Sequence, residues 1–233
     1  MLNMEVFECI NTRRSIRKYL DIPVEWDKVG TILEAGRLAP NSGNIQDYNF
    51  IVVQDEDHRK TIAEASLRQH WMSKAPVYIV VCADLKKSER FYGIRGERLY
   101  SVQNCAAAIE NMLLTANSLG LGACWVGAFD ENVISRVLNI PDYVRPQAII
   151  TIGYSDEKPK APQRFPLTTV TFLEKYGNRI KDMPSVMHDY SLIMERNFKK
   201  GKAIFENTGK KTGSLLTEKG KELAKKIKEK FKK

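Results

Sequence analysis

An arginine-rich segment near the N-terminus has the residue types that bind phosphate. Arg13, Arg14, Ser15 and Arg17 lie within five consecutive positions. A phosphate dianion accepts hydrogen bonds from donors of this kind: guanidinium groups, a hydroxyl and backbone N–H groups. The same run of charges is also typical of a solvated face or of a patch that binds polyanions without selectivity. The segment alone leaves these alternatives open.

A second polar segment, residues 39–46, is dense in small side chains, amides and backbone donors. Its polar and turn-forming residues are Pro40, Asn41, Ser42, Asn44 and Gln46. Taken alone, this composition predicts a turn and nothing more. Combined with the arginine-rich segment, it supplies an amide-rich surface for the edge of a planar heterocycle beside a phosphate clamp. The combination points to a nucleotide-like cofactor.

Other chemistries find little support in the sequence. The three histidines stand apart from one another, and the four cysteines have no C-x-x-C spacing, so we predict no metal site and reduced core thiols. The glycine-rich string at residues 120–127 has the reverse order of a dinucleotide fingerprint, because a predicted helix precedes it and a predicted strand follows. No side-chain catalytic residue is predicted.

Hydrophobic periodicity predicts the elements that must position these segments. Helices are expected over 5–11, 25–38, 55–69, 96–119 and 131–138, and strands over 49–54, 77–83, 123–129 and 147–154. The strand at 77–83 is a nearly continuous apolar run, typical of a strand buried on both faces. The helix at 96–119 is the longest, and Gly120 is expected to end it in a left-handed conformation. Helices alternating with short strands indicate an α/β or α+β fold.

Four ordered motifs resemble those of the FMN-dependent nitroreductase family and span roughly residues 1–176. They are Arg13-Arg14-Ser15-x-Arg17; Ala39-Pro40-x-x-Gly43-Asn44-x-Gln46; Gly122-x-x-Trp125-x-Gly127-x-Phe129; and Gly153-Tyr154 leading to Lys158-Pro159 and Arg164. Two departures stand out. Family members commonly have Pro-Trp where this chain has Asp47-Tyr48, and many have a further basic residue where it has Pro162-Gln163.

The resemblance implies an α+β fold with a central, mostly antiparallel sheet wrapped by helices, working as an obligate homodimer with FMN at the subunit interface. It implies that Arg13, Ser15 and Arg164 hold the FMN phosphate, that Arg14 contacts the ribityl or phosphate region, and that Arg17 reaches the pyrimidine edge. The loop residues Pro40, Asn41, Ser42, Asn44 and Gln46 would line the cofactor across the dimer. Gly127 and Ala128 would present backbone N–H groups to flavin N5 and O4.

The implied activity is that of an oxidoreductase in which the flavin N5 carries the hydride. NADH or NADPH reduces FMN, and a small electron-poor acceptor, such as a nitro compound or a quinone, then takes the same place in a ping-pong cycle. We expect residues 86–95 to form the loop that faces the substrate, with Phe91 and Tyr92 either covering the flavin or belonging to the core.

The net charge of +9 is confined to the C-terminal tail. Residues 1–176 hold 21 basic and 21 acidic residues, whereas residues 177–233 hold 16 against 7. We therefore predict an FMN-binding domain over 1–176 and a basic, mainly helical extension over 177–233. Its narrow apolar stripe between Thr217 and Lys232 is expected to dock on the other subunit, with an anionic membrane surface or nucleic acid as alternatives.

The leading function is thus an NAD(P)H-dependent FMN reductase, located in the cytoplasm because no apolar stretch is long enough to span a membrane and the first residues do not resemble a signal peptide. Two alternatives remain at this point. One is a specialised reaction on the same scaffold, such as reductive dehalogenation or flavin fragmentation. The other is a nucleic-acid or membrane-surface binding protein that acts through its basic tail, although nucleic-acid binding is not favoured by the electrically balanced body.

Overall fold

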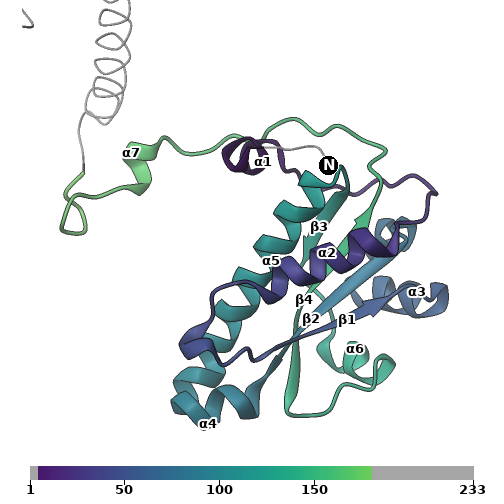
Figure 1. Cartoon of the computed structure of the whole chain (residues 1–233), viewed down its shortest axis with the longest axis horizontal. Helices are drawn as coiled ribbons and strands as arrows, with labels where there is room; N and C mark the ends of the chain where they lie inside the picture. The colour runs from purple at the N-terminus through teal and green to yellow at the C-terminus, as the bar shows by residue number, and fades with distance from the viewer. Residues whose placement is uncertain (1–4, 180–233) are drawn as a thin grey trace, which may run out of the picture. The chain divides into compact units, whose positions relative to one another are not determined.

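Four strands pair into one antiparallel sheet in the order β1-β2-β4-β3 (Figure 1). A computed structural model describes residues 5–179. The strands are β1 (Tyr48–Val53), β2 (Val77–Asp84), β3 (Gly122–Val126) and β4 (Val144–Gly153). β1 and β3 form the two edges of the sheet. The predicted mostly antiparallel sheet is confirmed.

Helices alternate with these strands, as predicted. They are α1 (Val6–Thr12), α2 (Trp26–Arg37), α3 (Glu56–Ala65), α4 (Leu85–Arg95), α5 (Ser101–Ser118), α6 (Glu131–Val137) and α7 (Leu167–Val170). Short 3₁₀ helices form η1 (Ser42–Asn44) and η2 (His70–Lys74), and a π-helical turn forms η3 (Gly96–Tyr100). No helix within residues 5–179 combines the length and apolar character needed to cross a membrane.

Each face of the sheet carries its own apolar core. Val77, Ile79 and Val81 of β2 share one core with residues of α2 and α5, whereas Tyr78 and Val80 share the other with residues of α3 and α6. Successive residues of a strand point to opposite faces, so a strand covered on both sides must be apolar throughout. The sequence-based prediction for β2 is therefore confirmed.

Helix α5 covers one face of the sheet, and the chain after it turns at Gly120, as predicted. Gly120 has φ of 74°, a left-handed conformation that a residue without Cβ adopts without steric cost. The buried side of α5 begins with Ser101 and Asn104 before it becomes apolar at Cys105, Ala108 and Ile109. A polar beginning of the buried face was not predicted.

Several predicted elements differ from the structure. The strand expected over 123–129 ends at Val126, and α5 begins at Ser101 and not at residue 96. Helix α3 ends at Ala65 and not near Gln69, because the chain turns through left-handed conformations at Leu67 and Arg68, with φ of 54° and 55°. Residues 86–95, predicted to be a loop, belong to helix α4. The Asp84 side chain caps this helix by accepting a hydrogen bond of 2.9 Å from the Lys87 backbone N–H.

The chain divides after Pro162 into two compact units. In the second unit the structure describes residues 163–179, which contain α7 and a bridge between Phe172 and Arg179. The Arg179 guanidinium lies 5.8 Å from the centre of the Phe172 ring. Apart from its first three residues, the predicted basic extension at 177–233 lies outside the described part of the chain, as does the predicted helix at 217–232.

Candidate functional site

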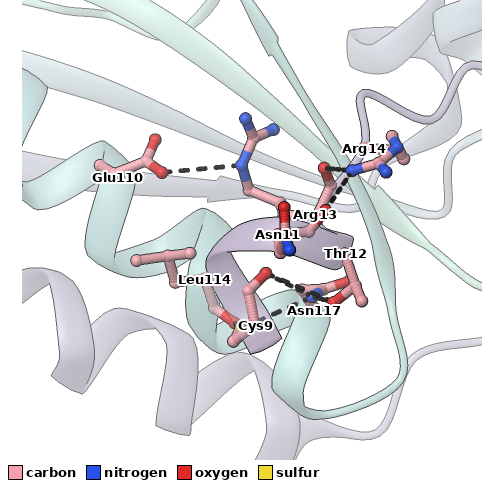
Figure 2. A network of polar contacts seen from close by, with 8 residues as sticks. All are labelled: Cys9, Asn11, Thr12, Arg13, Arg14, Glu110, Leu114 and Asn117. Carbon is pink, nitrogen blue, oxygen red and sulfur yellow. Dashed lines mark hydrogen bonds and ion pairs between the residues drawn. The ribbon is translucent and has the colours of Figure 1, made fainter. Parts of the chain in front are cut away.

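Arg13 stands where α1 ends and faces the middle of α5. Its Nε lies 3.6 Å from Glu110 Oε1, and its side chain is 24% exposed against 47% for Glu110. Figure 2 shows the terminal nitrogens of Arg13 pointing away from Glu110. The guanidinium therefore has one carboxylate beside its Nε, while its terminal nitrogens point elsewhere.

The end of α1 is fastened to the C-terminal half of α5 by an amide. Asn117 Nδ2 donates to the Cys9 carbonyl at 3.1 Å and to Thr12 Oγ1 at 3.0 Å. The Cys9 thiol donates to the Leu114 carbonyl at 3.1 Å (Figure 2). Because these bonds hold the residues just before Arg13, they set where the arginine-rich segment leaves the helix.

The arginine-rich segment then runs along the edge strand β3. Ser15 forms a parallel bridge with Ala123, and the Ile16 N–H donates to the Ala123 carbonyl at 3.0 Å. A Cβ on Gly122 would come within 2.9 Å of three Ile16 atoms. Gly122 is thus required for the segment to lie this close to β3.

A cavity of about 340 Å³ opens beside this segment. Its lining includes Arg13, Arg14 and Lys158, with Glu157 as the acidic residue. Glu157 Oε1 already accepts from the Arg17 N–H at 2.5 Å and from the Lys18 N–H at 3.1 Å. Three cationic side chains against one engaged carboxylate give the cavity a positive balance, which suits an anionic ligand.

Arg14 and Arg17 differ in their surroundings. Arg14 Nη1 donates to the carbonyls of Asn11 at 2.7 Å and Arg13 at 2.8 Å, which folds the side chain back onto the segment (Figure 2). The Arg17 guanidinium lies 5.8 Å from the centre of the Trp71 ring, within cation–π range. Burial raises the pKa of the nearby Cys124 thiol, and Arg17, a Ser15 hydrogen bond and Arg13 oppose that rise.

The loop at 40–46 has a tightly bent backbone. Gly43, Asn44 and Gln46 adopt left-handed conformations with φ of 54°, 56° and 49°. Asn41 Oδ1 accepts from the Gln46 N–H at 2.9 Å and closes the turn. Glycine adopts this conformation without steric cost and asparagine readily, whereas for Gln46 it is disfavoured and is held by the Asn41 hydrogen bond.

Buried polar groups hold this loop to α5. The Ser42 N–H and hydroxyl donate to Asn104 Oδ1 at 2.9 and 3.2 Å, and Asn104 Nδ2 donates to the fully buried Asp47 at 2.8 Å. Asp47 and Asn104 were not predicted as site residues. A signal existed for Asp47, since it replaces a residue that the family pattern makes apolar.

Gly127 and Ala128 follow β3 and are exposed. A Cβ on Gly127 would meet nothing nearer than Trp125 Nε1 at 3.7 Å, an ordinary contact. Packing among the described residues therefore gives no reason for a glycine there. A ligand or second chain that approaches the backbone would give one.

The structure brings some predicted residues together and keeps others apart. Arg13, Arg14, Ser15 and Arg17 form one group beside β3, and the 40–46 loop forms another before β1 at the opposite edge of the sheet. Asn104 and Asn117, which hold the two groups, lie thirteen residues apart on α5, or about 20 Å. Arg164 is exposed and belongs to the second unit, and Lys158, which the prediction omitted, lines the cavity.

No group of three or more potential metal ligands occurs in the part of the chain that the structure describes. The four cysteines are buried and unbridged, as predicted.

Comparison with known proteins adds independent findings. The model of the nitroreductase family matches residues 10–71 and 66–154. A Bacillus subtilis protein named FMN reductase (NAD(P)H) is 31% identical over 188 residues, which cover 75% of this chain and 76% of that protein. A Thermus thermophilus protein named NADH dehydrogenase is 29% identical over 185 residues, covering 68% of this chain and 90% of that one.

A solved structure shares the fold. The FMN-dependent nitroreductase from Clostridium difficile superposes with a TM-score of 0.63 at 29% identity, over 72% of this chain and 98% of the other. These are the proteins that the chain is similar to.

Proposed function

The chain belongs to the nitroreductase family, and we propose that it uses bound FMN to pass electrons from NADH or NADPH to nitro compounds, quinones or similar electron-poor acceptors. Membership of this family supports the enzyme class, that of an NAD(P)H-dependent flavin oxidoreductase. Bound FMN supplies a hydride acceptor at N5 and, in a second half-reaction at the same place, an electron donor. The observation that carries the proposal is the positively lined cavity beside Arg13, Arg14 and Lys158.

Arg13, Arg14 and Lys158, which line this cavity, fit the phosphate end of FMN. As the family resemblance implies, Arg13, Ser15 and Arg164 would hold the phosphate, and Arg14 would contact the ribityl or phosphate region. Charged donors give the strongest hydrogen bonds to phosphate oxygens. The phosphate end is therefore held chiefly by charge.

The ring system would lie further along β3. From Ala123 to Val126 the strand covers about 10 Å, and Gly127 and Ala128 lie beyond it, which separates a phosphate subsite from a ring subsite. Arg17 would reach the pyrimidine edge, where a cation favours negative charge and so raises the reduction potential. The backbone N–H groups of Gly127 and Ala128 would meet N5 and O4.

We further propose that the site is completed by a second copy of the chain. The loop residues Pro40, Asn41, Ser42, Asn44 and Gln46 would line the FMN held by the arginines of the other subunit, because one chain keeps the two groups at opposite edges of the sheet. Apolar side chains on α1, among them Val6 and Phe7 with 72% and 78% exposure, would be covered in such a dimer.

The direct test is spectroscopic. The purified protein, or the apoprotein mixed with FMN, should show flavin absorption bands and release FMN, not FAD, on denaturation. NADH or NADPH should bleach these bands, and a nitroaromatic or quinone should restore them. A protein that cannot be reconstituted with FMN contradicts the proposal, and reconstituted protein that no acceptor reoxidises points to a specialised reaction instead.

A further inference from the structure

The carboxylate of Asp47 joins two helices beneath the 40–46 loop. One oxygen, Oδ1, accepts from Asn104 Nδ2 of α5 at 2.8 Å, and the other, Oδ2, accepts from the Ser88 hydroxyl of α4. The Asp47 carbonyl also accepts from the Asp84 N–H at 2.7 Å. All three side chains, those of Asp47, Ser88 and Asn104, are buried. This residue therefore lies in a fully engaged buried network.

The carboxylate determines which way the Asn104 amide faces. A carboxylate accepts hydrogen bonds and donates none, whereas an amide has a donating end and an accepting end. Asn104 must therefore turn Nδ2 toward Asp47, which leaves Oδ1 for the Ser42 N–H at 2.9 Å and hydroxyl at 3.2 Å. The position of Ser42 is thus set by a chain of hydrogen bonds that starts at Asp47.

Helix α4 touches the same loop at two further points. Lys87 Nζ donates to the Gln46 carbonyl at 3.1 Å. The Tyr92 hydroxyl lies so close to Gly43 that a Cβ there would stand 2.1 Å from it. Phe91 and Tyr92 remain 59% and 39% exposed. Together with the Ser88 contact, these points make α4 and the loop a single unit.

We propose that Asp47 is a positioning residue for the flavin site. By fixing the Asn104 amide and binding Ser88, it sets the loop that lines FMN and the helix that carries Phe91 and Tyr92 in one mutual arrangement. The inference rests on the proposed function, because it takes the loop as a lining of the FMN site. Asp47 acts through Asn104 and Ser42 and does not itself contact the cofactor.

An exchange of side chains tests this role. Asn104→Asp alone sets two carboxylates against each other. Asp47→Asn alone keeps an acceptor for Asn104 Nδ2 but replaces a charged hydrogen bond by a weaker neutral one, while the Ser42 N–H still requires Asn104 Oδ1. The double variant Asp47→Asn/Asn104→Asp keeps every hydrogen bond and moves the negative charge from position 47 to position 104. In it, the amide introduced at position 47 donates to the carboxylate introduced at position 104, and that carboxylate also accepts from Ser42. Asn132→Asp, at an exposed position of α6, makes the same charge change as Asn104→Asp and serves as a matched control.

The measurements are the FMN dissociation constant, from quenching of flavin fluorescence, the position of the bound flavin band, and the melting temperature of each apoprotein. Asn104→Asp should weaken FMN binding by about tenfold or more, because a hydrogen bond is lost and two carboxylates meet, and Asp47→Asn by about threefold to tenfold, because a charged hydrogen bond becomes a neutral one. The double variant should return to within about twofold of wild type, with the wild-type band. The Asn132→Asp control should not change.

The outcomes separate the two proposals. Wild-type protein that binds no FMN contradicts the proposed function, and the role of Asp47 with it. Wild-type protein that binds FMN, with Asp47→Asn and Asn104→Asp binding it equally well, overturns only the role of Asp47. A double variant that regains its melting temperature but not its FMN affinity or flavin band also overturns it, because that result assigns the network to stability alone.

Discussion

The two ends of α5 hold the two polar groups of the site in opposite ways. Near its N-terminus, Asn104 is buried and connects Ser42 to the buried carboxylate of Asp47. Near its C-terminus, the half-buried Asn117 binds the end of α1, and at mid-helix the half-exposed Glu110 lies 3.6 Å from Arg13. The N-terminal end thus rests on the buried Asn104–Asp47 pair, and the rest of the helix contributes partly exposed groups.

The two polar groups of the site therefore differ in what they offer a ligand: the 40–46 loop offers a fixed shape, and the arginine-rich segment offers positive charge. Buried hydrogen bonds keep one geometry and are screened little by salt, so the 40–46 loop is pre-organised. Partly exposed arginines can move toward a ligand, and their attraction falls with ionic strength. A cofactor with a rigid ring system and a flexible, doubly charged tail needs both kinds of support.

The largest effect is expected from removing the buried amide. Asn104→Leu leaves the Asp47 oxygen and the Ser42 N–H without their partner, and should lower the free energy of unfolding by about 3 kcal/mol. Asn117→Leu, the same change at the other end of α5, should cost about 1 kcal/mol because water reaches that site. Thermal or urea unfolding of the apoproteins checks this. Equal losses at both positions would refute the contrast between the two ends.

A second prediction concerns charge at the phosphate end. Arg13→Ala and Arg164→Ala should each weaken FMN binding by about 1.5–3 kcal/mol, one to two decades in affinity, since each removes a charged donor to the phosphate. Titrations at low and high salt should show a shallower salt dependence in both variants. Because Pro162-Gln163 lacks the usual additional cation, the Arg164 loss should be at the upper end. An unchanged affinity in Arg164→Ala would remove Arg164 from the phosphate subsite.

The thiols offer a milder test of the same contrast. Burial, and after it Asp47, raises the pKa of Cys105, so thiolate is scarce there in the native protein. We expect iodoacetamide to label Cys9, in the short helix α1, at least about tenfold faster than Cys105, because α1 opens more easily than α5. Peptide mass mapping over time gives both rates. Raising the pH should speed labelling of Cys105, and similar rates for the two thiols would contradict the prediction.

The smallest effect is expected at Glu110. Removing its charge in Glu110→Gln frees Arg13 from a partly exposed ion pair, which is worth about 0–1 kcal/mol. FMN binding should therefore tighten by up to about fivefold. Glu97→Gln on η3 is a suitable control because it removes the same charge near the other end of α5. Weaker binding in Glu110→Gln would mean that Glu110 orients Arg13 for the ligand.

Local patterns predicted much of the fold. The apolar run of β2 predicted a strand buried on both faces, and that is what the structure has. Gly120 predicted a helix that ends in a left-handed conformation, which is also observed. Within the predicted helix, the apolar Val102 is 41% exposed, whereas the polar Ser101 and Asn104 are buried. A periodicity argument assumes that buried means apolar, and Asn104 is buried because Asp47 and Ser42 supply partners from far along the chain.

The candidate site was predictable only in part. Arg13 and Arg14 could be named from residue type, and the structure places both at the cavity. Lys158 and Glu157 were not identified, because nothing local shows that residues 155–159 return to the arginine-rich segment. Residues 86–95 were predicted as a loop and form helix α4, which Gly93 interrupts with φ of 59°.

The contact between Gly122 and Ile16 also bears on solubility. β3 is an edge strand, and unpaired backbone groups on an edge recruit strands from other molecules. By lying against β3 through the Ile16 N–H and the Ser15 bridge, the segment that carries the arginines occupies part of that edge. A larger residue at 122 would push Ile16 away. Such a change would uncover β3, so damage to the binding segment and a tendency to aggregate would arise together.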